Sequence, residues 1–225
     1  VTLVPASRST YLIGNVFTAE VKHKNIFPGV ESEINPIGRS LMVRYAYESN
    51  KFNPLDDYVI EDGVYVPIYT RVLFHRLELQ WDEHVSSFID HHTINLSVRG
   101  AGILGKTVDN FFDFYAGGVL GMKGYPFYAL GGNTVATAGF AYRFPLVRQI
   151  NFRFLQFYFT KLYASVFGDI GNAWTGEPRS GGVWKKDAVF ELRLEAFSFY
   201  AYPTRFFFSG SYGFDKFERT FYETR

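Results

Sequence analysis

Hydrophobic and polar residues alternate over most of this sequence, most clearly in Asp187–Lys216. Side chains of a β-strand point alternately to opposite faces, so Glu191, Arg193 and Glu195 share one face of a predicted strand and hydrophobic residues share the other. The segment Thr204–Lys216 repeats this pattern with aromatic residues on its apolar face. A short turn separates the two, so the sequence predicts a β-hairpin with one apolar and one wet face.

The same alternation predicts seven further strands. A soluble β-sandwich would show it too, but several of these segments have the length that a tilted strand needs to cross a bilayer. The predicted strands are Tyr11–Lys24, Ser40–Ser49, Tyr69–Glu83, His92–Leu104, Phe112–Leu120, Asn133–Phe144 and Lys161–Gly171. We interpret Ile150–Thr160 as a turn at a membrane rim, and Asn50–Pro67 as a long connection with room for strands of its own.

Composition supports a membrane sheet over a soluble one. Aromatic residues make up 20% of the chain, and aromatic girdles at both membrane interfaces are one use for such a surplus. No apolar run approaches the length of a spanning helix, which leaves strands as the spanning element. We therefore predict an all-β fold, an antiparallel transmembrane β-barrel.

We expect residues 1–225 to form a single barrel domain that is incomplete at both ends. The nine predicted strands are an odd number, whereas bacterial single-chain barrels have an even number and must close, because an open edge cannot lie in lipid. Further strands on both sides would complete the barrel.

No catalytic residue, metal site or cofactor is predicted. The chain has no cysteine, and its net charge of +1 does not indicate a nucleic-acid partner. Gly100–Thr107 fits the phosphate-binding pattern G-x-x-x-x-G-K-[ST], but the aromatic, glycine-ended sequence after it resembles a strand rather than the required helix, so we do not expect nucleotide binding. His91 and His92 are adjacent and would point to opposite faces of a strand, so we interpret them as part of a solvated loop.

Two short motifs are more specific. The first is Met122-Lys123-Gly124-Tyr125, within a glycine-rich segment, and the second is Phe167-Gly-Asp169-Ile-Gly171 on a predicted strand. With the intervening strand that ends Tyr142-Arg-Phe-Pro145, they resemble the bacterial surface-antigen superfamily of outer-membrane barrels, which includes the outer-membrane protein assembly factor and polypeptide-translocation relatives. That family carries (V/I)-R-G-(F/Y) at the tip of a loop folded into the barrel and F-x-D-x-G on a wall strand. The resemblance implies roughly strands seven to fifteen of a sixteen-strand barrel, in the bacterial cell outer membrane.

The resemblance also implies a contact between Lys123 and Asp169, where the family has an arginine–aspartate pair that tethers the loop. Alternation independently places Asp169 on the polar face of its strand, with Tyr163 and Ser165. Lysine keeps the positive charge of arginine but lacks its planar fork, so a weaker or rearranged tether is expected. The alternative is that Lys123 is an ordinary loop lysine.

By this resemblance the protein is a non-catalytic barrel for outer-membrane protein assembly or polypeptide translocation. Its expected partners are outer-membrane lipid and a client polypeptide or periplasmic and outer-membrane subunits, with no nucleic acid and no nucleotide. Two alternatives stay open. The barrel could anchor a larger enzyme, for example a patatin-like lipid hydrolase, or serve as a structural subunit of an outer-membrane complex.

Overall fold

The computed structural model describes residues 10–27, 36–105, 107–118, 121–176, 184–199 and 202–216, and these are almost entirely β-strands and their connections. One turn of 3-10 helix, η1, spans Asn110–Phe112. No helix in the described part of the chain is long and apolar enough to cross a membrane. The prediction of an all-β fold is confirmed.

One large antiparallel sheet dominates the structure. Its path runs β1-β2-β5-β6-β9-β11-β12-β13, and β10 pairs with the beginning of β11. The strands are β1 (Leu12–Ile26), β2 (Gly38–Phe52), β5 (Thr70–Ser86), β6 (Thr93–Leu104), β9 (Thr134–Val147), β10 (Phe152–Phe154), β11 (Phe157–Trp174), β12 (Lys185–Ser198) and β13 (Tyr202–Gly213). Two small hairpins lie outside it, β3 (Tyr58–Glu61) with β4 (Val64–Pro67) and β7 (Phe114–Ala116) with β8 (Leu130–Gly132).

Eight of the nine predicted strands lie in the large sheet, and most are longer than predicted. The prediction for Phe112–Leu120 is wrong: only β7 is extended there, and it pairs with β8 instead of joining the sheet, so β6 pairs directly with β9. Gly117 and Gly118 end β7 because their φ angles of 120° and 77° are incompatible with a strand. The long connection after β2 does contain strands, β3 and β4, and the predicted rim turn at Ile150–Thr160 is a short hairpin of β10 and β11.

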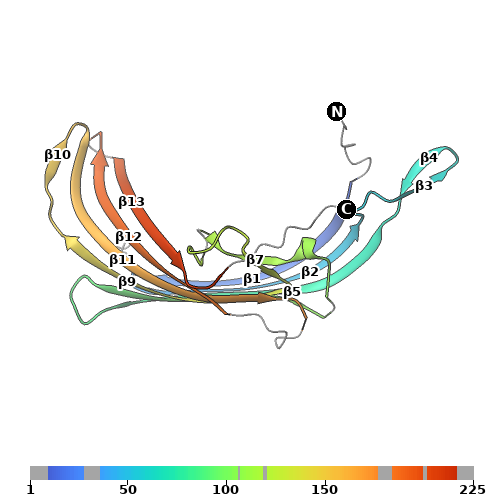
Figure 1. Cartoon of the computed structure of the whole chain (residues 1–225), viewed down its shortest axis with the longest axis horizontal. Helices are drawn as coiled ribbons and strands as arrows, with labels where there is room; N and C mark the ends of the chain where they lie inside the picture. Colours follow the sequence, from blue (N-terminus) through green and yellow to red (C-terminus); the bar gives the residue numbers. More distant parts are fainter. Residues whose placement is uncertain are drawn as a thin grey trace.

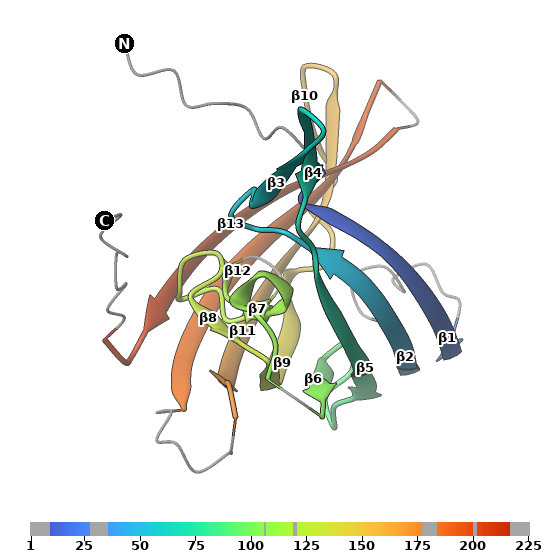
Figure 2. The same cartoon turned by 90° about the vertical axis from the view of Figure 1, so that its right-hand side faces the viewer.

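The sheet bends into a trough (Figure 1), as expected of twisted antiparallel strands. The segment that contains β7 and β8 lies on the concave side of the trough, between its two wings (Figures 1 and 2). β1 and β13 are the two edges of the sheet and do not pair with each other, so the described residues form an open sheet and the predicted barrel closure is not observed.

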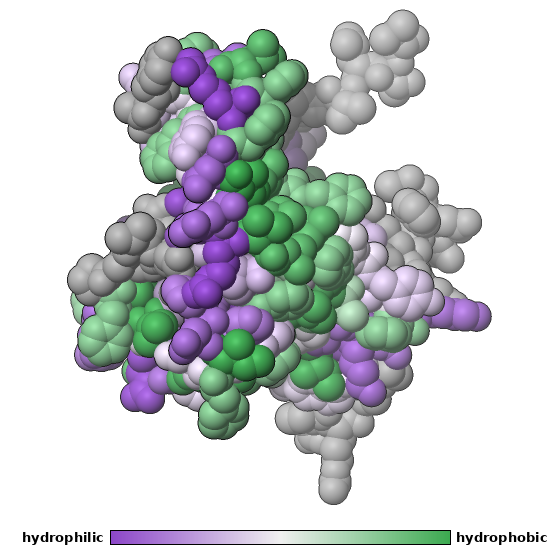
Figure 3. All heavy atoms as spheres, turned by 90° about the vertical axis from the view of Figure 1, so that its left-hand side faces the viewer, coloured by the Kyte–Doolittle hydropathy of each residue, from purple (hydrophilic) through white to green (hydrophobic). Residues whose placement is uncertain are grey.

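The two faces of the sheet differ in polarity. The convex face exposes hydrophobic side chains such as Phe140, Val166 and Phe190, which are 44–47% exposed. In the view of Figure 3, hydrophobic side chains form a continuous patch beside a stripe of hydrophilic ones. On the concave face, Arg44 of β2 forms ion pairs with Glu20 of β1 at 2.6 Å and with Glu78 of β5 at 3.7 Å. The polar face of each strand is therefore the inner one.

The connections at the two ends of the strands are unequal. Residues 53–69, 105–133 and 175–184 connect strands at one end, which we call the long-loop end. At the other end, the connections 87–92 and 199–201 are short, the connection 148–156 contains β10, and 27–37 is longer. The inner surface is thus entered from the long-loop end by the longest connection, 105–133.

Candidate functional site

The described residues of the connection 105–133, which we call the inner loop, contain the first sequence motif and lie against the concave wall. Gly117, Gly118 and Gly121 all have positive φ angles, which allow the sharp turns that bring the loop back onto the sheet. Three of its side chains are buried together, and small alanines pack around them; they are Met122, Tyr125 and Leu130 with Ala116, Ala129 and Ala173. Met122 is completely buried, so the tip of the loop is a packed part of the structure.

Two aspartates of the wall bind the backbone of this tip. The Met122 N–H donates to Asp169 Oδ2 on β11 at 3.3 Å, and the Gly124 N–H donates to Asp187 Oδ2 on β12 at 2.5 Å. Asp187 Oδ1 also accepts the Asp169 backbone N–H at 3.2 Å, so the Asp187 carboxylate binds both the loop tip and the neighbouring strand β11. Hydrogen bonds to a carboxylate are about twice as strong as neutral ones, and these two hold consecutive parts of the tip.

Gly124 fits this place because it has no side chain. A Cβ at Gly124 would lie 2.6 Å from the Asp187 Cβ and 2.8 Å from the Gly213 backbone nitrogen on β13. A Cβ at Gly213 would in turn lie 2.8 Å from the Gly124 carbonyl oxygen. The close approach of loop and wall therefore depends on glycine on both sides.

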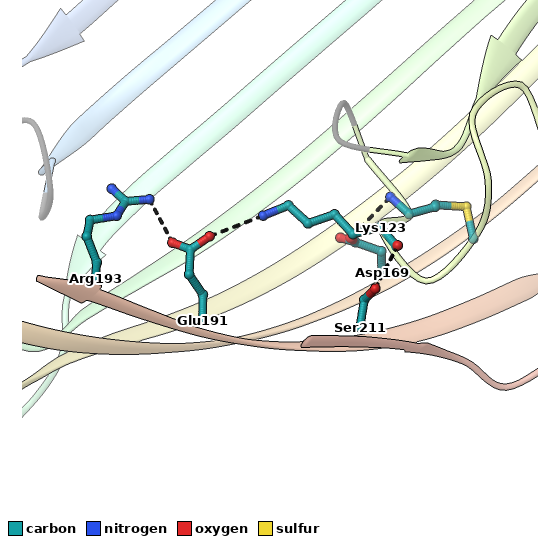
Figure 4. Close-up of polar contacts among 6 residues, drawn as sticks. Lys123, Asp169, Glu191, Arg193 and Ser211 are labelled. Atoms are coloured by element: carbon teal, nitrogen blue, oxygen red, sulfur yellow. Dashed lines mark hydrogen bonds and ion pairs between the residues drawn. The ribbon is translucent and has the colours of Figure 1, made fainter. Parts of the chain in front are cut away.

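The loop also reaches β13 and the residues that follow it. The Tyr125 hydroxyl donates to the Lys186 carbonyl at 2.8 Å and accepts the Asp215 N–H at 3.1 Å. Burial raises the pKa of Tyr125, so its hydroxyl keeps the proton that it donates. Ser211 Oγ donates to the Lys123 carbonyl at 2.9 Å (Figure 4). The motif is thus fixed to β11, β12 and β13 together.

The Lys123 side chain has a different partner from the predicted one. It extends along the wall and its Nζ lies 3.4 Å from Glu191 Oε2, whose other oxygen accepts from Arg193 at 2.7 Å (Figure 4). The same Nζ lies 4.7 Å from the centre of the Phe167 ring. Lys123 still acts on Asp169 through its charge, but the hydrogen bond to Asp169 comes from the Met122 backbone. The expected Lys123–Asp169 pair is therefore corrected to a Lys123–Glu191 pair, because the extended lysine side chain reaches past Asp169.

The other predicted site residues lie on the same concave wall. Gly171 faces the Met122 sulfur, where a Cβ would collide, and Phe167 lies under Lys123. Glu191 forms ion pairs with both Lys123 and Arg193. Glu195 shares their face but pairs with Arg205 at 3.6 Å, away from the loop.

A second set of contacts holds the first half of the inner loop to the opposite wing. Arg76 of β5 donates to the Phe112 carbonyl at 2.6 Å, and its guanidinium lies 4.7 Å from the centre of the Phe114 ring. Asn133 Nδ2 donates to Asp113 Oδ1 at 2.5 Å, which closes the base of the loop. The inner loop therefore bridges the trough, and a cavity of about 220 Å³ lies between its tip and β6, β9 and β11.

Sequence reasoning missed Asp187, Ser211 and Gly213. Asp187 had a usable signal, because it is in phase with Glu191 and Arg193 on the polar face of the same strand. Its importance depends on the register, which places it opposite Asp169, and alternation within one strand does not reveal that pairing. Ser211 and Gly213 belong to the site because the inner loop packs on β13, and no pattern in the sequence indicates that packing.

The two apparent enzyme motifs have structural roles. Gly100 and Gly102 lie within β6, and the segment after the pattern forms η1, whose cap is Asp109. His92 is hydrogen bonded to the Tyr142 hydroxyl at 2.6 Å. Within the described ranges, no group of three or more histidine, aspartate or glutamate side chains could hold a metal ion.

No family model and no curated protein sequence matches this chain.

Proposed function

We propose that this sheet is part of a bacterial outer-membrane β-barrel, with its convex face in lipid and its concave face in the lumen. The exposed hydrophobic side chains of the convex face support this, because a large apolar surface in contact with water is energetically unfavourable. Aromatic groups lie toward both ends of the convex strands: Tyr47 and His75 toward the long-loop end, and His92, Tyr142 and Phe144 at the other. Two aromatic girdles and unequal loops are typical of such barrels.

We propose further that additional strands pair with the edges at β1 and β13. Unpaired backbone N–H and C=O groups are too costly in hydrocarbon, so both edges need partners if the convex face lies in lipid. By the family resemblance the complete barrel has about sixteen strands.

Within this barrel, we propose a role in outer-membrane protein assembly or polypeptide translocation. The observation that carries the proposal is the inner loop, whose Met122–Tyr125 motif is held on the lumen wall by Asp169 and Asp187. A loop fixed to β11, β12 and β13 couples the lumen contents to the wall beside β13, where the joint with the additional strands would form the seam of the barrel. A client chain would be handled there by backbone pairing and by displacement of the loop, with no cofactor.

The membrane orientation can be tested with single cysteines, because residues 1–225 contain no cysteine of their own. We would place one cysteine at Phe208 on the convex face of β13, or at its neighbour Ser209 on the concave face, in the full-length protein reconstituted in liposomes. We expect a water-soluble maleimide to label Ser209→Cys quickly and Phe208→Cys at least ten times more slowly. Equal labelling of both would contradict the proposed orientation.

The cellular role needs a separate test. We expect depletion of the full-length protein in its host to lower the amounts of folded outer-membrane barrels or of a secreted protein, measured by heat-modifiable gel migration and by immunoblots. Unchanged levels of both, with loss of a lipid-hydrolysing activity, would favour the membrane anchor of an enzyme.

A further inference from the structure

Arg143 of β9 is unusual among the charged side chains of the concave wall. It is half-buried, its Nε is buried without a hydrogen-bond partner, and its guanidinium lies 5.7 Å from the centre of the Phe167 ring. Register places it between Thr93 of β6 and Ser165 of β11. Among the described residues, Arg143 forms no ion pair, although Arg44, Arg76 and Arg193 on the same wall each do.

The charges around Arg143 do not neutralise it. Arg193 and Glu191 from β12 are the charged groups that act on it, and Arg143 in turn acts on His84 of β5. Glu191 is the carboxylate that acts on Arg143, and its two oxygens already bind Arg193 and Lys123. Lys123 also lies in the field of Asp169 and Asp187, so the unbalanced charge belongs to Arg143 and Arg193, which share Glu191 and leave one positive charge in excess.

A partly buried charge without a partner is costly, so this arrangement favours a bound anion. An arginine fork matches the oxygens of phosphate in two parallel hydrogen bonds, and the lysine ammonium adds a point charge. A phosphate group carries a charge of about −1.5 to −2 at pH 7 and offers three strong acceptor oxygens, one for each of the three cationic side chains. A carboxylate offers only two oxygens.

We propose that Arg143, Arg193 and Lys123 form a phosphate-binding site on the concave wall. The phosphate is either inorganic or the terminal phosphomonoester of a lipid, and both present the same oxygens. Because Lys123 belongs to the inner loop and Arg143 and Arg193 to the wall, the bound phosphate adds a further link between them. The site requires only the concave face, so it stands or falls independently of membrane insertion.

Calorimetric titration of the full-length protein in a non-ionic detergent tests the site with sodium phosphate as the probe. The variants are Arg143→Met, which removes the charge, Arg143→Lys, which keeps the charge without the fork, and Arg148→Met as an exposed control just after β9. We expect phosphate affinity to fall at least tenfold in Arg143→Met, to fall less in Arg143→Lys, and to stay unchanged in Arg148→Met. Acetate at equal ionic strength should bind at least tenfold more weakly than phosphate.

Thermal unfolding separates loss of binding from loss of folding. Without phosphate, Arg143→Met should unfold at or above the wild-type midpoint, because it removes an unpaired buried charge. Phosphate at ten times its dissociation constant should raise the wild-type midpoint by about 4 °C and leave that of Arg143→Met unchanged. Phosphate that binds equally to wild type and both Arg143 variants, or to none of them, would overturn the proposal.

A second titration with short-chain phosphatidic acid identifies the source. Tighter binding of the lipid than of free phosphate, lost in Arg143→Met, assigns the site to a lipid headgroup. Equal or weaker binding of the lipid, with phosphate binding that depends on Arg143, assigns it to the free ion.

Discussion

Asp187 on β12 lies directly opposite Asp169 on β11, and both carboxylates accept backbone N–H groups from the tip of the inner loop. The N–H donors belong to Met122 and Gly124, the residues on either side of Lys123. These hydrogen bonds come from backbone N–H groups, so they do not depend on the charge of the Lys123 side chain. Lysine can therefore stand where the resembled family has arginine without releasing the loop.

We predict that Asp187→Ala releases the loop tip more than Asp169→Ala or any change of the Lys123 side chain. It removes the 2.5 Å bond to Gly124 and the link to Asp169, each a charge-assisted hydrogen bond worth about 1.5–3 kcal/mol. Limited chymotrypsin digestion, which can cut after Phe127 or Tyr128, should become about 10 to 100 times faster. Asp169→Ala should have a smaller effect in the same direction.

The control for this digestion is Asp90→Ala, in the short turn between β5 and β6. It should leave cleavage in the inner loop at the wild-type rate. If Asp187→Ala is cut no faster than this control, the hydrogen bonds from the loop backbone to the two aspartates do not hold the loop.

We predict that Gly124→Ala displaces the loop without changing any charge. The new methyl group would meet the Asp187 side chain and the β13 backbone, and neither is a flexible group that can move aside. We expect faster chymotrypsin cleavage than in wild type and a lower unfolding midpoint. Gly210→Ala is the matched control, because its new Cβ meets nothing within 4 Å, and an equal effect of the two changes would rule out the close contact as the cause.

Much of this fold follows from the alternation of single strands, and much of the site does not. The polar faces that carry Asp169, Glu191 and Arg193 could be predicted because face follows from spacing along one strand. Which residue of β12 lies opposite Asp169 depends on the register between two strands, and that register is set by the whole sheet. For this reason Asp187 was missed.

The error at β7 has a similar origin. Its aromatic residues fit a strand, but Gly117 and Gly118 turn the chain away after Ala116, and the extended piece pairs within the loop. Likewise, the partner of Lys123 could not be predicted from the motif, because a long flexible side chain has several carboxylates within reach. Local patterns predict elements, and long-range packing decides their partners.

We predict that Lys123→Met leaves the loop in place. Its side chain contacts Glu191 and Phe167, and Glu191 keeps Arg193 as a partner after the change. A partly exposed ion pair of this kind contributes about 1 kcal/mol or less, compared with the larger contribution of the two aspartate bonds. Chymotrypsin cleavage should therefore rise less than about fivefold. A rise equal to that of Asp187→Ala would show that the side chain, and not the backbone, is the main tether.

We predict that an arginine on the convex face blocks membrane insertion and that one on the concave face does not. Phe190 of β12 is exposed on the convex face in the middle of its strand, and Ser209 of β13 lies on the concave face opposite Glu191. At the midplane of a bilayer, an arginine that faces lipid costs about 2–4 kcal/mol, whereas one that faces a wet lumen does not. In refolding of the full-length protein into liposomes, Phe190→Arg should therefore lower the yield of the heat-modifiable folded form by at least tenfold. Ser209→Arg should keep the wild-type yield. Equal yields would place the convex face in water or against protein and would remove the main physical support for a lipid-facing sheet.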